Sequence, residues 1–271
     1  MLFVCPKCKN ALSVSSDGRA VCESGHSYDR AKEGYYNLLL KNTGGVHGDN
    51  KEMVLARRAF LDTGAYLPLV DKLSEIACRF VKDGDCVLDA GCGEGYYTDL
   101  VERSLIDSGI NALVSGFDIS RDAVKFASKK NKRLSLAVAS SYDMPVLDGS
   151  VDFLINVFSP LALSETVRVL RRGGRFVMAI PDVNHLFGLK KVLYERPYKN
   201  TVEDSGLSGL KLVSQDKISY KLLLDSSDKI SSLFMMTPYA YRTPKEARER
   251  LLSLESLETD IEFIVFTYEK E

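Results

Sequence analysis

The sequence predicts an α/β fold: a parallel sheet with helices on both faces, preceded by a small metal-binding segment. Short, almost wholly apolar segments alternate with amphipathic helical segments over most of the chain, which is the pattern of a parallel sheet buried on both faces. A glycine-rich turn, Gly91-Cys92-Gly93-Glu94-Gly95, follows one of these apolar segments. Three cysteines and a histidine gather near the N-terminus, at Cys5, Cys8, Cys22 and His26.

Composition and charge indicate a soluble globular protein. The 271 residues are 45% apolar, enough for one large domain and a small appendage. A formal net charge of −1 argues against a globally basic nucleic-acid binder, so any basic surface must be local. No apolar run approaches the roughly 20 residues of a membrane helix, and the N-terminus lacks the long apolar core of a signal peptide. We therefore expect a cytoplasmic protein with no membrane partner, whose cysteines are thiols or metal ligands.

The N-terminal cysteines and histidine follow the spacing C-x2-C-x13-C-x3-H. Strand-like pieces at 11–14 and 19–22 predict a hairpin that brings two ligand-bearing turns together. Zinc takes four tetrahedral nitrogen or sulfur ligands, and a segment this short needs the metal to fold. Because protein would fill all four positions, we expect a structural site with one zinc per chain. The alternative is two chance cysteine pairs in a loop.

The chain divides into three predicted parts: a zinc ribbon at 1–36, a linker and connecting helix at 37–65, and a large domain at 66–271. The stretch from Asn42 to Asn50 contains two adjacent glycines and is predicted as a loop, in which His47 is solvated. A helical pattern follows at 51–65. After Tyr66-Leu67-Pro68-Leu69, a second amphipathic helix is predicted through Leu73, Ile76, Ala77 and Phe80.

The glycine-rich turn sits between an apolar strand and an amphipathic helix, the context in which such a motif carries meaning. Glycines let the backbone turn sharply and let a ligand lie against it. With Asp89 just inside the strand, the form D-x-G-x-G-x-G resembles motif I of class I S-adenosylmethionine (AdoMet) methyltransferases. Gly91, Gly93, Glu94 and Gly95 would then face an amino acid joined to a nucleoside, and Asp89 would suit its ammonium. A glycine-rich surface turn or an NAD site are the alternatives.

Later strands are predicted at 112–117, 134–139, 151–157 and 175–180, with a helix from Arg121 to Lys130. Asp118 closes the second strand, where a carboxylate can accept hydrogen bonds from both ribose hydroxyls. In the resembling enzymes the loop with Ser140 and Ser141 flanks the adenine. Ligands of such sheets bind outside the carboxyl ends of the strands. The segments expected there are Asp89, Gly91–Gly95, Asp118, Ser140–Asp143, Asn156–Pro160 and Pro181–His185.

Two strands near the C-terminus, 213–220 and 260–268, are predicted to close the sheet as an antiparallel pair. Between them, Met235-Met236-Thr237-Pro238-Tyr239 either walls the active site or packs in the core.

Several motifs occur in a fixed order along the chain. They are Cys5-x2-Cys8 with Cys22-x3-His26, Ala31-Lys32-Glu33-Gly34-Tyr35, Arg57-Arg58-Ala59-Phe60-Leu61-Asp62, Gly91 to Tyr97, Pro181-x3-His185-Leu186 and Met236-Thr237-Pro238. On these motifs the whole chain resembles the bacterial 23S ribosomal RNA guanine-N1 methyltransferases. These enzymes join a class I (Rossmann-like) methyltransferase domain to an N-terminal zinc ribbon, and variants are tied to antibiotic response.

The resemblance implies methylation of a guanine in a hairpin loop of 23S ribosomal RNA, with AdoMet as methyl donor and no DNA partner. It also implies a homodimer with a cleft for the hairpin, and a ribbon that contacts RNA. Tyr66, Gly95, Tyr96 and His185 match positions that line the AdoMet site. The stretch from Asn156 to Leu161 departs from the more basic or tyrosine-bearing sequence expected of relatives, which leaves base recognition open.

The sulfonium of AdoMet makes its methyl carbon electrophilic, so the protein must align guanine N1 rather than supply a nucleophile. N1 carries a proton that a base or water must accept. Asp182 and Asp143 are the candidate bases, while Asn156 could only orient the guanine. Arg57, Arg58, Lys125 and Lys129 would supply local positive charge for RNA. A small-molecule methyltransferase and a binding module with an inactive enzyme domain are the alternatives; the intact Asp89, glycines and Asp118 argue against the second.

Overall fold

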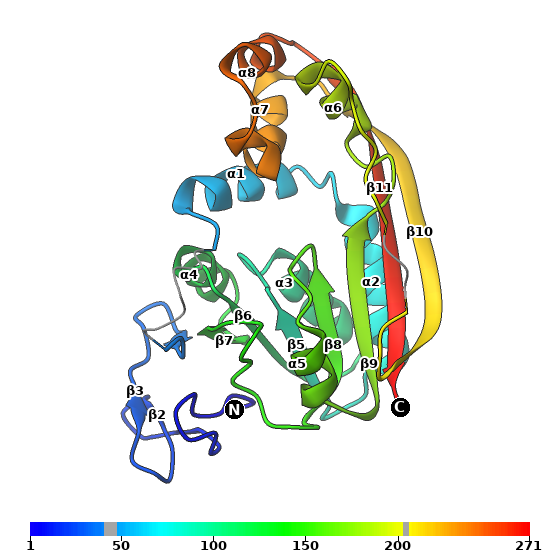
Figure 1. Ribbon diagram of the computed structural model, residues 1–271. Helices are drawn as coiled ribbons and strands as arrows, with labels where there is room; N and C mark the ends of the chain where they lie inside the picture. Colours follow the sequence, from blue (N-terminus) through cyan, green and yellow to red (C-terminus); the bar gives the residue numbers. More distant parts are fainter. Residues whose placement is uncertain (41–47, 203–205) are drawn as a thin grey trace.

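A mixed sheet forms the centre of the computed structural model, which describes residues 1–40, 48–202 and 206–271. Among these residues the strands of the large sheet follow the order β10-β11-β9-β8-β5-β6-β7-β4. Neighbouring strands from β9 to β4 run parallel, whereas β11 and β10 are antiparallel (Figure 1). The predicted parallel sheet with a closing antiparallel pair is therefore confirmed. His47 lies outside the described residues.

The predicted strands of the large domain are all present, although the last three are longer than predicted and a short strand at Tyr36–Asn37 was not predicted. The ribbon contains β1 Ser13–Val14, β2 Ala20–Val21 and β3 Ser27–Tyr28. The large sheet contains β4 Tyr36–Asn37, β5 Cys86–Ala90, β6 Leu113–Asp118, β7 Ser135–Val138, β8 Val151–Val157, β9 Leu170–Pro181, β10 Leu210–Leu224 and β11 Leu257–Lys270. The helices are α1 Lys51–Leu61, α2 Leu67–Phe80, α3 Tyr96–Asp107, α4 Arg121–Lys130, α5 Leu163–Val169, α6 Phe187–Leu193, α7 Ser227–Met235 and α8 Lys245–Leu252, with a 3-10 helix, η1, at Pro238–Tyr241.

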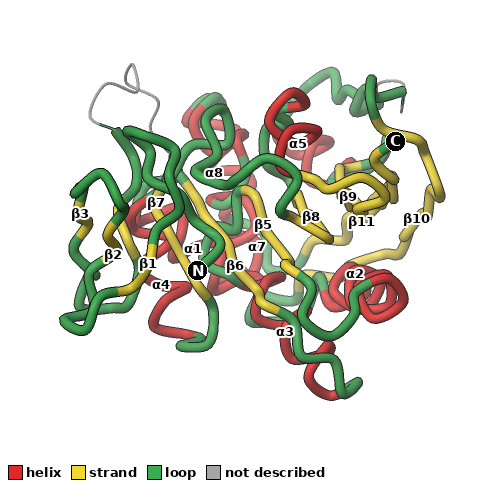
Figure 2. Tube along the Cα trace, turned by 90° about the horizontal axis from the view of Figure 1, so that it is seen from below, coloured by secondary structure: helices red, strands yellow, loops and turns green. Residues whose placement is uncertain are grey.

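Alternation along the strands sends side chains into two cores, one on each face of the sheet. Val87 and Phe153 join the core beneath α2, α3 and α4, while Leu88 and Leu154 join the opposite one. Figure 2 shows α2, α3 and α4 along one side of the sheet and α5 along the other. This two-sided cover is what the apolar strands predict.

The N-terminal segment completes the second face. Residues 139–150, all described, connect β7 to β8 without a helix. Phe3 and Leu12 of the ribbon belong to the same core as Leu88, and the Val4 amide donates to the Pro145 carbonyl at 2.8 Å. In addition, β4 pairs in parallel with β7 at the sheet edge. The division of the chain at residue 36 stays a prediction, because the first 40 residues pack as part of the large core.

Helix α1 lies across the carboxyl edge of the sheet. Its first turn is capped by Asn50, whose side chain accepts the Met53 amide at 2.9 Å, and it ends before a turn in which Gly64 has φ of +77°. In Figure 1 the arrows of β5 and β8 point toward α1, and α7 and α8 stack beyond it. The predicted helix at 51–65 is thus shorter at its C-terminal end, because the Gly64 turn redirects the chain into α2.

No helix in the described ranges is long and apolar enough to cross a membrane.

A close approach of α6 to β11 generates a stability prediction. A Cβ at Gly188 would lie 2.2 Å from the Glu258 carbonyl oxygen and 2.8 Å from the Thr259 Cα. Gly188→Ala must therefore push α6 away from the strand, and we expect a loss of about 1–3 kcal/mol in unfolding free energy. Urea denaturation measures it. Lys191→Ala, an exposed position on the same helix, is the matched control and should change stability by about 0.5 kcal/mol or less.

Candidate functional site

The four predicted metal ligands converge in the ribbon. One ligand atom from each of Cys5, Cys8, Cys22 and His26 lies within 4.8 Å of all the others. The Cys8 and Cys22 sulfurs are 3.6 Å apart, and His26 Nδ1 lies 3.5 Å from the sulfurs of both Cys5 and Cys22. Tetrahedral zinc with ordinary bond lengths requires edges of about 3.5–3.8 Å. These separations therefore fit ligand edges around one zinc ion.

Two tight turns present these ligands. Lys9, with φ of +62°, donates its amide to the Cys5 carbonyl at 2.8 Å, and the Gly25 amide donates to the Cys22 carbonyl at 3.0 Å. The Tyr28 hydroxyl lies 3.1 Å from the Cys5 sulfur, where it can donate to a metal-bound thiolate. The hairpin of β1 and β2 joins the turns, as the sequence predicts.

The glycine loop is held to the end of the neighbouring strand. Asp118, the last residue of β6, accepts the Gly93 amide at 2.9 Å and the Ser120 amide at 2.7 Å. Gly91 is required for packing, since a Cβ there would lie 2.1 Å from Ser159 Oγ. A Cβ at Gly95 would likewise lie 2.9 Å from the Cβ of Ala127 in α4.

Asp89 carries a buried oxygen with no partner. Its Oδ2 accepts from the Thr98 hydroxyl at 2.5 Å, whereas Oδ1 has no hydrogen bond within the described part of the chain. Burial raises the pKa of Asp89 to about 7. Gly93, four residues later, has φ of +55°, and the nearest atom to a Cβ there, Arg57 Nη1, is 4.0 Å away. The strand end thus offers an unsatisfied acceptor, Asp89 Oδ1, and the following loop offers open backbone at Gly93.

Glu94 and Tyr96, at the end of the glycine loop and the start of α3, are both buried. Glu94 is buried with Oε1 unpaired among the described residues, and burial raises its pKa to about 7. Its other oxygen lies 3.9 Å from Arg58 Nε. The buried Tyr96 ring carries the Lys130 ammonium 5.1 Å above its centroid. Both side chains therefore contact cations, Glu94 that of Arg58 on α1 and Tyr96 that of Lys130 on α4.

The remaining loops meet the same edge. The Ala139 amide donates to the Asp118 carbonyl at 3.1 Å, which sets Ser140 and Ser141 beside the end of β6. The Asn156 amide group donates to the Ala90 carbonyl at 3.3 Å, next to the glycine loop.

Tyr66 and His185, 119 residues apart, form a buried pair at 3.3 Å between the hydroxyl and Nε2. The Glu262 amide donates to His185 Nδ1 at 3.3 Å, so Nε2 carries the proton of the neutral ring and donates to Tyr66. Burial, aided by the nearby Lys190 charge, lowers the pKa of His185 to about 3. His185 is therefore a neutral hydrogen-bond donor rather than a base.

A buried lysine positions the loop that carries His185. Lys190 is fully buried, with its ammonium 4.4 Å from the Tyr198 ring centroid and 2.6 Å from Asn200 Oδ1. The Asn200 amide group donates in turn to the carbonyls of Asp182 at 2.8 Å and His185 at 3.4 Å. Sequence reasoning missed this residue, although the spacing Lys190-x3-Tyr194-x3-Tyr198 was a signal.

Phe158 lies in the segment Asn156–Pro160 that the sequence predicts at this edge, but it was not singled out as a site residue. It follows β8 with φ of +54°, a strained conformation for a bulky residue, and its side chain is 40% exposed. Its ring centroid lies 6.3 Å from those of Tyr66 and Tyr97 and 5.3 Å from that of Phe263. A Phe-Ser-Pro sequence ending an apolar strand was the available signal.

The two candidate bases lie in different surroundings. Asp182 Oδ2 accepts from Lys217 of β10 at 3.1 Å, and Asp182 is buried. Asp143 accepts from Lys9 of the ribbon at 2.5 Å and is half-exposed. Asp182 therefore belongs to the loop of His185, and Asp143 to the ribbon side of the sheet.

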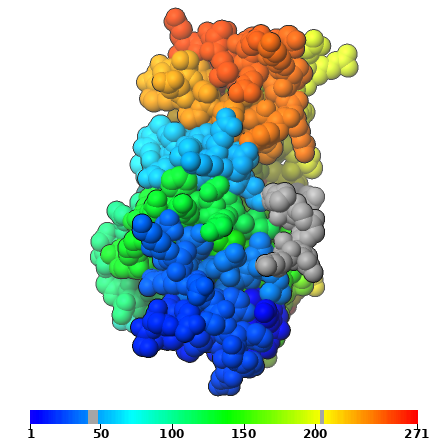
Figure 3. Space-filling model, turned by 90° about the vertical axis from the view of Figure 1, so that its left-hand side faces the viewer, coloured from blue at the N-terminus to red at the C-terminus, as the bar shows by residue number. Residues whose placement is uncertain are grey.

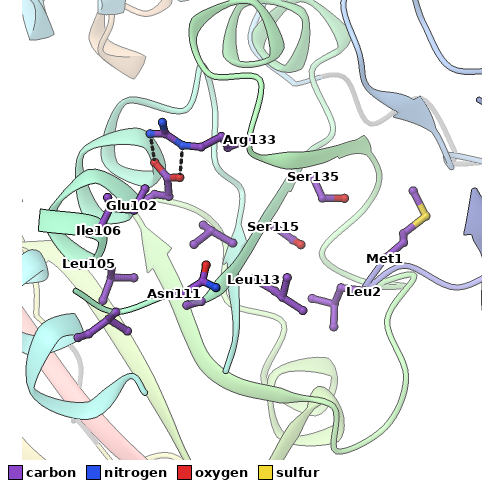
Figure 4. A pocket seen from close by; sticks show the side chains of 13 residues that line it. Met1, Leu2, Glu102, Leu105, Ile106, Asn111, Leu113, Ser115, Arg133 and Ser135 are labelled. Atoms are coloured by element: carbon purple, nitrogen blue, oxygen red, sulfur yellow. Dashed lines mark hydrogen bonds and ion pairs between the residues drawn. The ribbon is translucent and has the colours of Figure 1, made fainter. Parts of the chain in front are cut away.

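A separate cavity of about 290 Å³ opens at the other end of the strands. Figure 4 shows it between Met1, Leu113 at the start of β6, and the paired Arg133 and Glu102. Since Asp89 and Asp118 lie at the carboxyl ends, this cavity is not the ligand site predicted from the sequence.

Comparison with known proteins matches both parts of the chain. A family model described as "RlmA, N-terminal", a zinc ribbon, matches residues 3–41, and one described as "Methyltransferase domain" matches residues 88–178. The crystal structure of the YcgJ protein from Bacillus subtilis covers 74% of this chain and 98% of its own, with a TM-score of 0.48 and 16% identity.

Two curated relatives match almost end to end. The 23S rRNA (guanine(748)-N(1))-methyltransferase of Streptomyces fradiae is 33% identical over 271 residues, covering 97% of this chain and 94% of the relative. The YxjB protein of Bacillus subtilis is 30% identical over 271 residues, covering 96% and 94%. The chain therefore belongs to the family of 23S rRNA (guanine-N1)-methyltransferases, with a class I methyltransferase domain and an N-terminal zinc ribbon.

Proposed function

We propose that this protein methylates N1 of a guanine in a hairpin loop of 23S ribosomal RNA, using AdoMet. The observation that carries the proposal is the end-to-end similarity to the Streptomyces fradiae enzyme, whose name specifies methylation of a guanine N1 in 23S rRNA. The glycine loop, Asp89 and Asp118 support it, because all three lie together at the carboxyl edge.

The residues at that edge fit AdoMet. The unpaired Asp89 Oδ1 offers an acceptor for the ligand's ammonium, and the open face of Gly93 offers a backbone surface against which the ligand can lie. Asp118 would accept the ribose hydroxyls, and Ser140 with Ser141 would border the adenine. When bound, AdoMet supplies an electrophilic methyl group, so the protein's task is alignment and exclusion of water.

Tyr66 and His185 would line the AdoMet site as a fixed donor pair. Because His185 Nε2 donates to the Tyr66 oxygen, the tyrosine's own hydroxyl hydrogen is left to point at a ligand. The neutral imidazole adds no positive charge beside the ligand's sulfonium.

The guanine would enter between Phe158 and the loop of Asp182. An exposed, strained aromatic ring at the strand end offers a surface for stacking an unpaired base. Asp182 is our candidate to accept the N1 proton, directly or through water, because Lys190 and Asn200 hold its loop in place. Asp143, engaged by the ribbon, is the second candidate, and Asn156 would orient the base.

RNA would lie along the face drawn in Figure 3, which carries the ribbon, α1 and the α7–α8 region from bottom to top. We propose that the ribbon contacts RNA, that the enzyme is a homodimer with the hairpin in the cleft between subunits, and that it works in the cytoplasm, where ribosomal RNA is found. Light scattering with and without the hairpin tests the dimer.

Loss of a zinc ligand provides one prediction. Cys22→Ala should lower the zinc content from about one per chain toward zero and lower the midpoint of thermal unfolding, because the ribbon covers part of the second core. Metal analysis and thermal scans measure both. Cys78→Ala, outside the cluster, is the control. Zinc retained in Cys22→Ala would contradict the assignment.

Cofactor affinity provides a second prediction. Asp118→Ala should weaken AdoMet binding by about 1.5–3 kcal/mol, because it removes the ribose acceptor and frees the Gly93 amide. Gly93→Val should abolish binding, since its side chain would fill the ligand's space and a β-branched residue is strained at the φ of +55° that this loop requires. Calorimetric titration measures both. Asp107→Ala, exposed at the end of α3, should bind normally; wild-type affinity in all three variants would refute the site.

Transfer to RNA provides a third prediction. Tritiated methyl from AdoMet should appear as N1-methylguanosine in naked large-subunit RNA, and binding should weaken steeply with salt because phosphates are contacted. Phe158→Ala should reduce transfer while sparing AdoMet affinity. Label in a metabolite extract but not in RNA would indicate a small-molecule enzyme instead, and RNA binding without AdoMet consumption would indicate an inactive binding module.

A further inference from the structure

Arg57, one of two adjacent arginines expected to contact RNA, points instead at the glycine loop. It projects from α1. A Cβ built on Gly93 would have Arg57 Nη1 as its nearest neighbour, at 4.0 Å. The same nitrogen forms an ion pair with Asp49 Oδ2, and both side chains are mostly buried, at 30% and 25% exposure. The space above Gly93 is therefore bounded by backbone on one side and by a guanidinium on the other.

The charges around this space are otherwise acidic. Asp118 borders it, since it accepts the Gly93 amide, and Asp89 and Glu94 lie close to Gly93 in the chain. Burial raises the pKa of each of these carboxyls. The charge of Arg57 opposes that rise for Glu94 and Asp118. A ligand with a free carboxylate would be repelled here unless a cation met it, and Arg57 supplies one with a bidentate fork of donors.

The neighbouring cations, Arg58 and Lys130, contact other protein groups. Arg58 lies 3.6 Å from Asp62 and 3.9 Å from Glu94, with its guanidinium over the Phe126 ring. Lys130 lies over the Tyr96 ring. Arg57 is thus the cation best placed to meet a ligand on the loop.

Asp49 already presents a carboxylate to Arg57. Its backbone is fixed, because the Asp49 carbonyl accepts the Ser120 hydroxyl at 2.7 Å and a Cβ on Gly48 would lie 2.7 Å from Ile119. Its side chain is free of that constraint and can rotate. The ion pair therefore resembles the contact that a ligand carboxylate would make.

We propose that Arg57 binds the methionine carboxylate of AdoMet, and that the Asp49 side chain occupies its place until the ligand arrives. The inference rests on the proposed use of AdoMet by this site. The amino-acid part of the ligand then has a partner at each charged end: Asp89 for the ammonium and Arg57 for the carboxylate. Arg57 would select AdoMet over ligands that lack the carboxylate.

Titration calorimetry with AdoMet and with decarboxylated AdoMet, which lacks only that carboxylate, tests the proposal. R57M should weaken AdoMet binding about 10- to 100-fold and leave decarboxylated AdoMet within about twofold of wild type. R57K keeps the charge without the fork and should recover part of the AdoMet affinity. D49N removes the competing charge, so it should bind AdoMet as tightly as wild type or more so.

The outcomes separate this inference from the proposed function. If R57M weakens the binding of both ligands equally, or of neither, Arg57 does not recognise the carboxylate. If R57M lowers only the affinity for RNA, Arg57 contacts a phosphate instead. If D49N weakens AdoMet as much as R57M does, Asp49 supports the site and the exchange is wrong. Wild-type protein that binds neither ligand would overturn the proposed function itself. Should R57M fail to fold, R57K still tests the proposal. Its affinity for AdoMet should fall relative to its affinity for decarboxylated AdoMet, and an unchanged ratio would contradict the proposal.

Discussion

The hydrogen bond from the Gly93 amide to the Asp118 carboxylate is the contact on which the site depends. It exists because β5 and β6 pair in parallel, with Ala90 opposite Phe117, so the residues after both strands emerge side by side. The same carboxylate accepts the Ser120 amide at the start of α4. One side chain therefore fixes both the glycine loop and the start of the following helix.

The zinc ribbon is part of the sheet's architecture as well as a candidate RNA-binding element. The connection between β7 and β8 supplies no helix, and the apolar side chains of Phe3 and Leu12 fill the space that one would cover. A segment of 40 residues cannot build a sufficient core alone. Zinc closes the two turns, and the large domain provides the apolar surface on which the hairpin rests.

Buried polar groups concentrate at the carboxyl edge. Asp89, Glu94, His185 and Lys190 all have their pKa shifted toward the neutral form by burial, which costs folding free energy. The aromatic contacts of Tyr66 with Phe60 and Phe263, at centroid distances of 5.1 and 4.9 Å, offset part of that cost. Perturbed groups gathered in one place indicate a candidate ligand site.

Features that depend on neighbours along the chain were predictable from the sequence. Apolar runs predicted the strands, and the spacing of the cysteines and the histidine predicted the zinc site. The α/β pattern predicted that Asp89 and Asp118 lie at strand ends. Only the tertiary structure decided the pairing of Tyr66 with His185, the turn of Arg57 toward Gly93, the strain at Phe158 and the burial of Lys190. These depend on strand order and on how α1 and α6 cross the sheet, which bring together residues far apart in the sequence, and no local pattern encodes those distances.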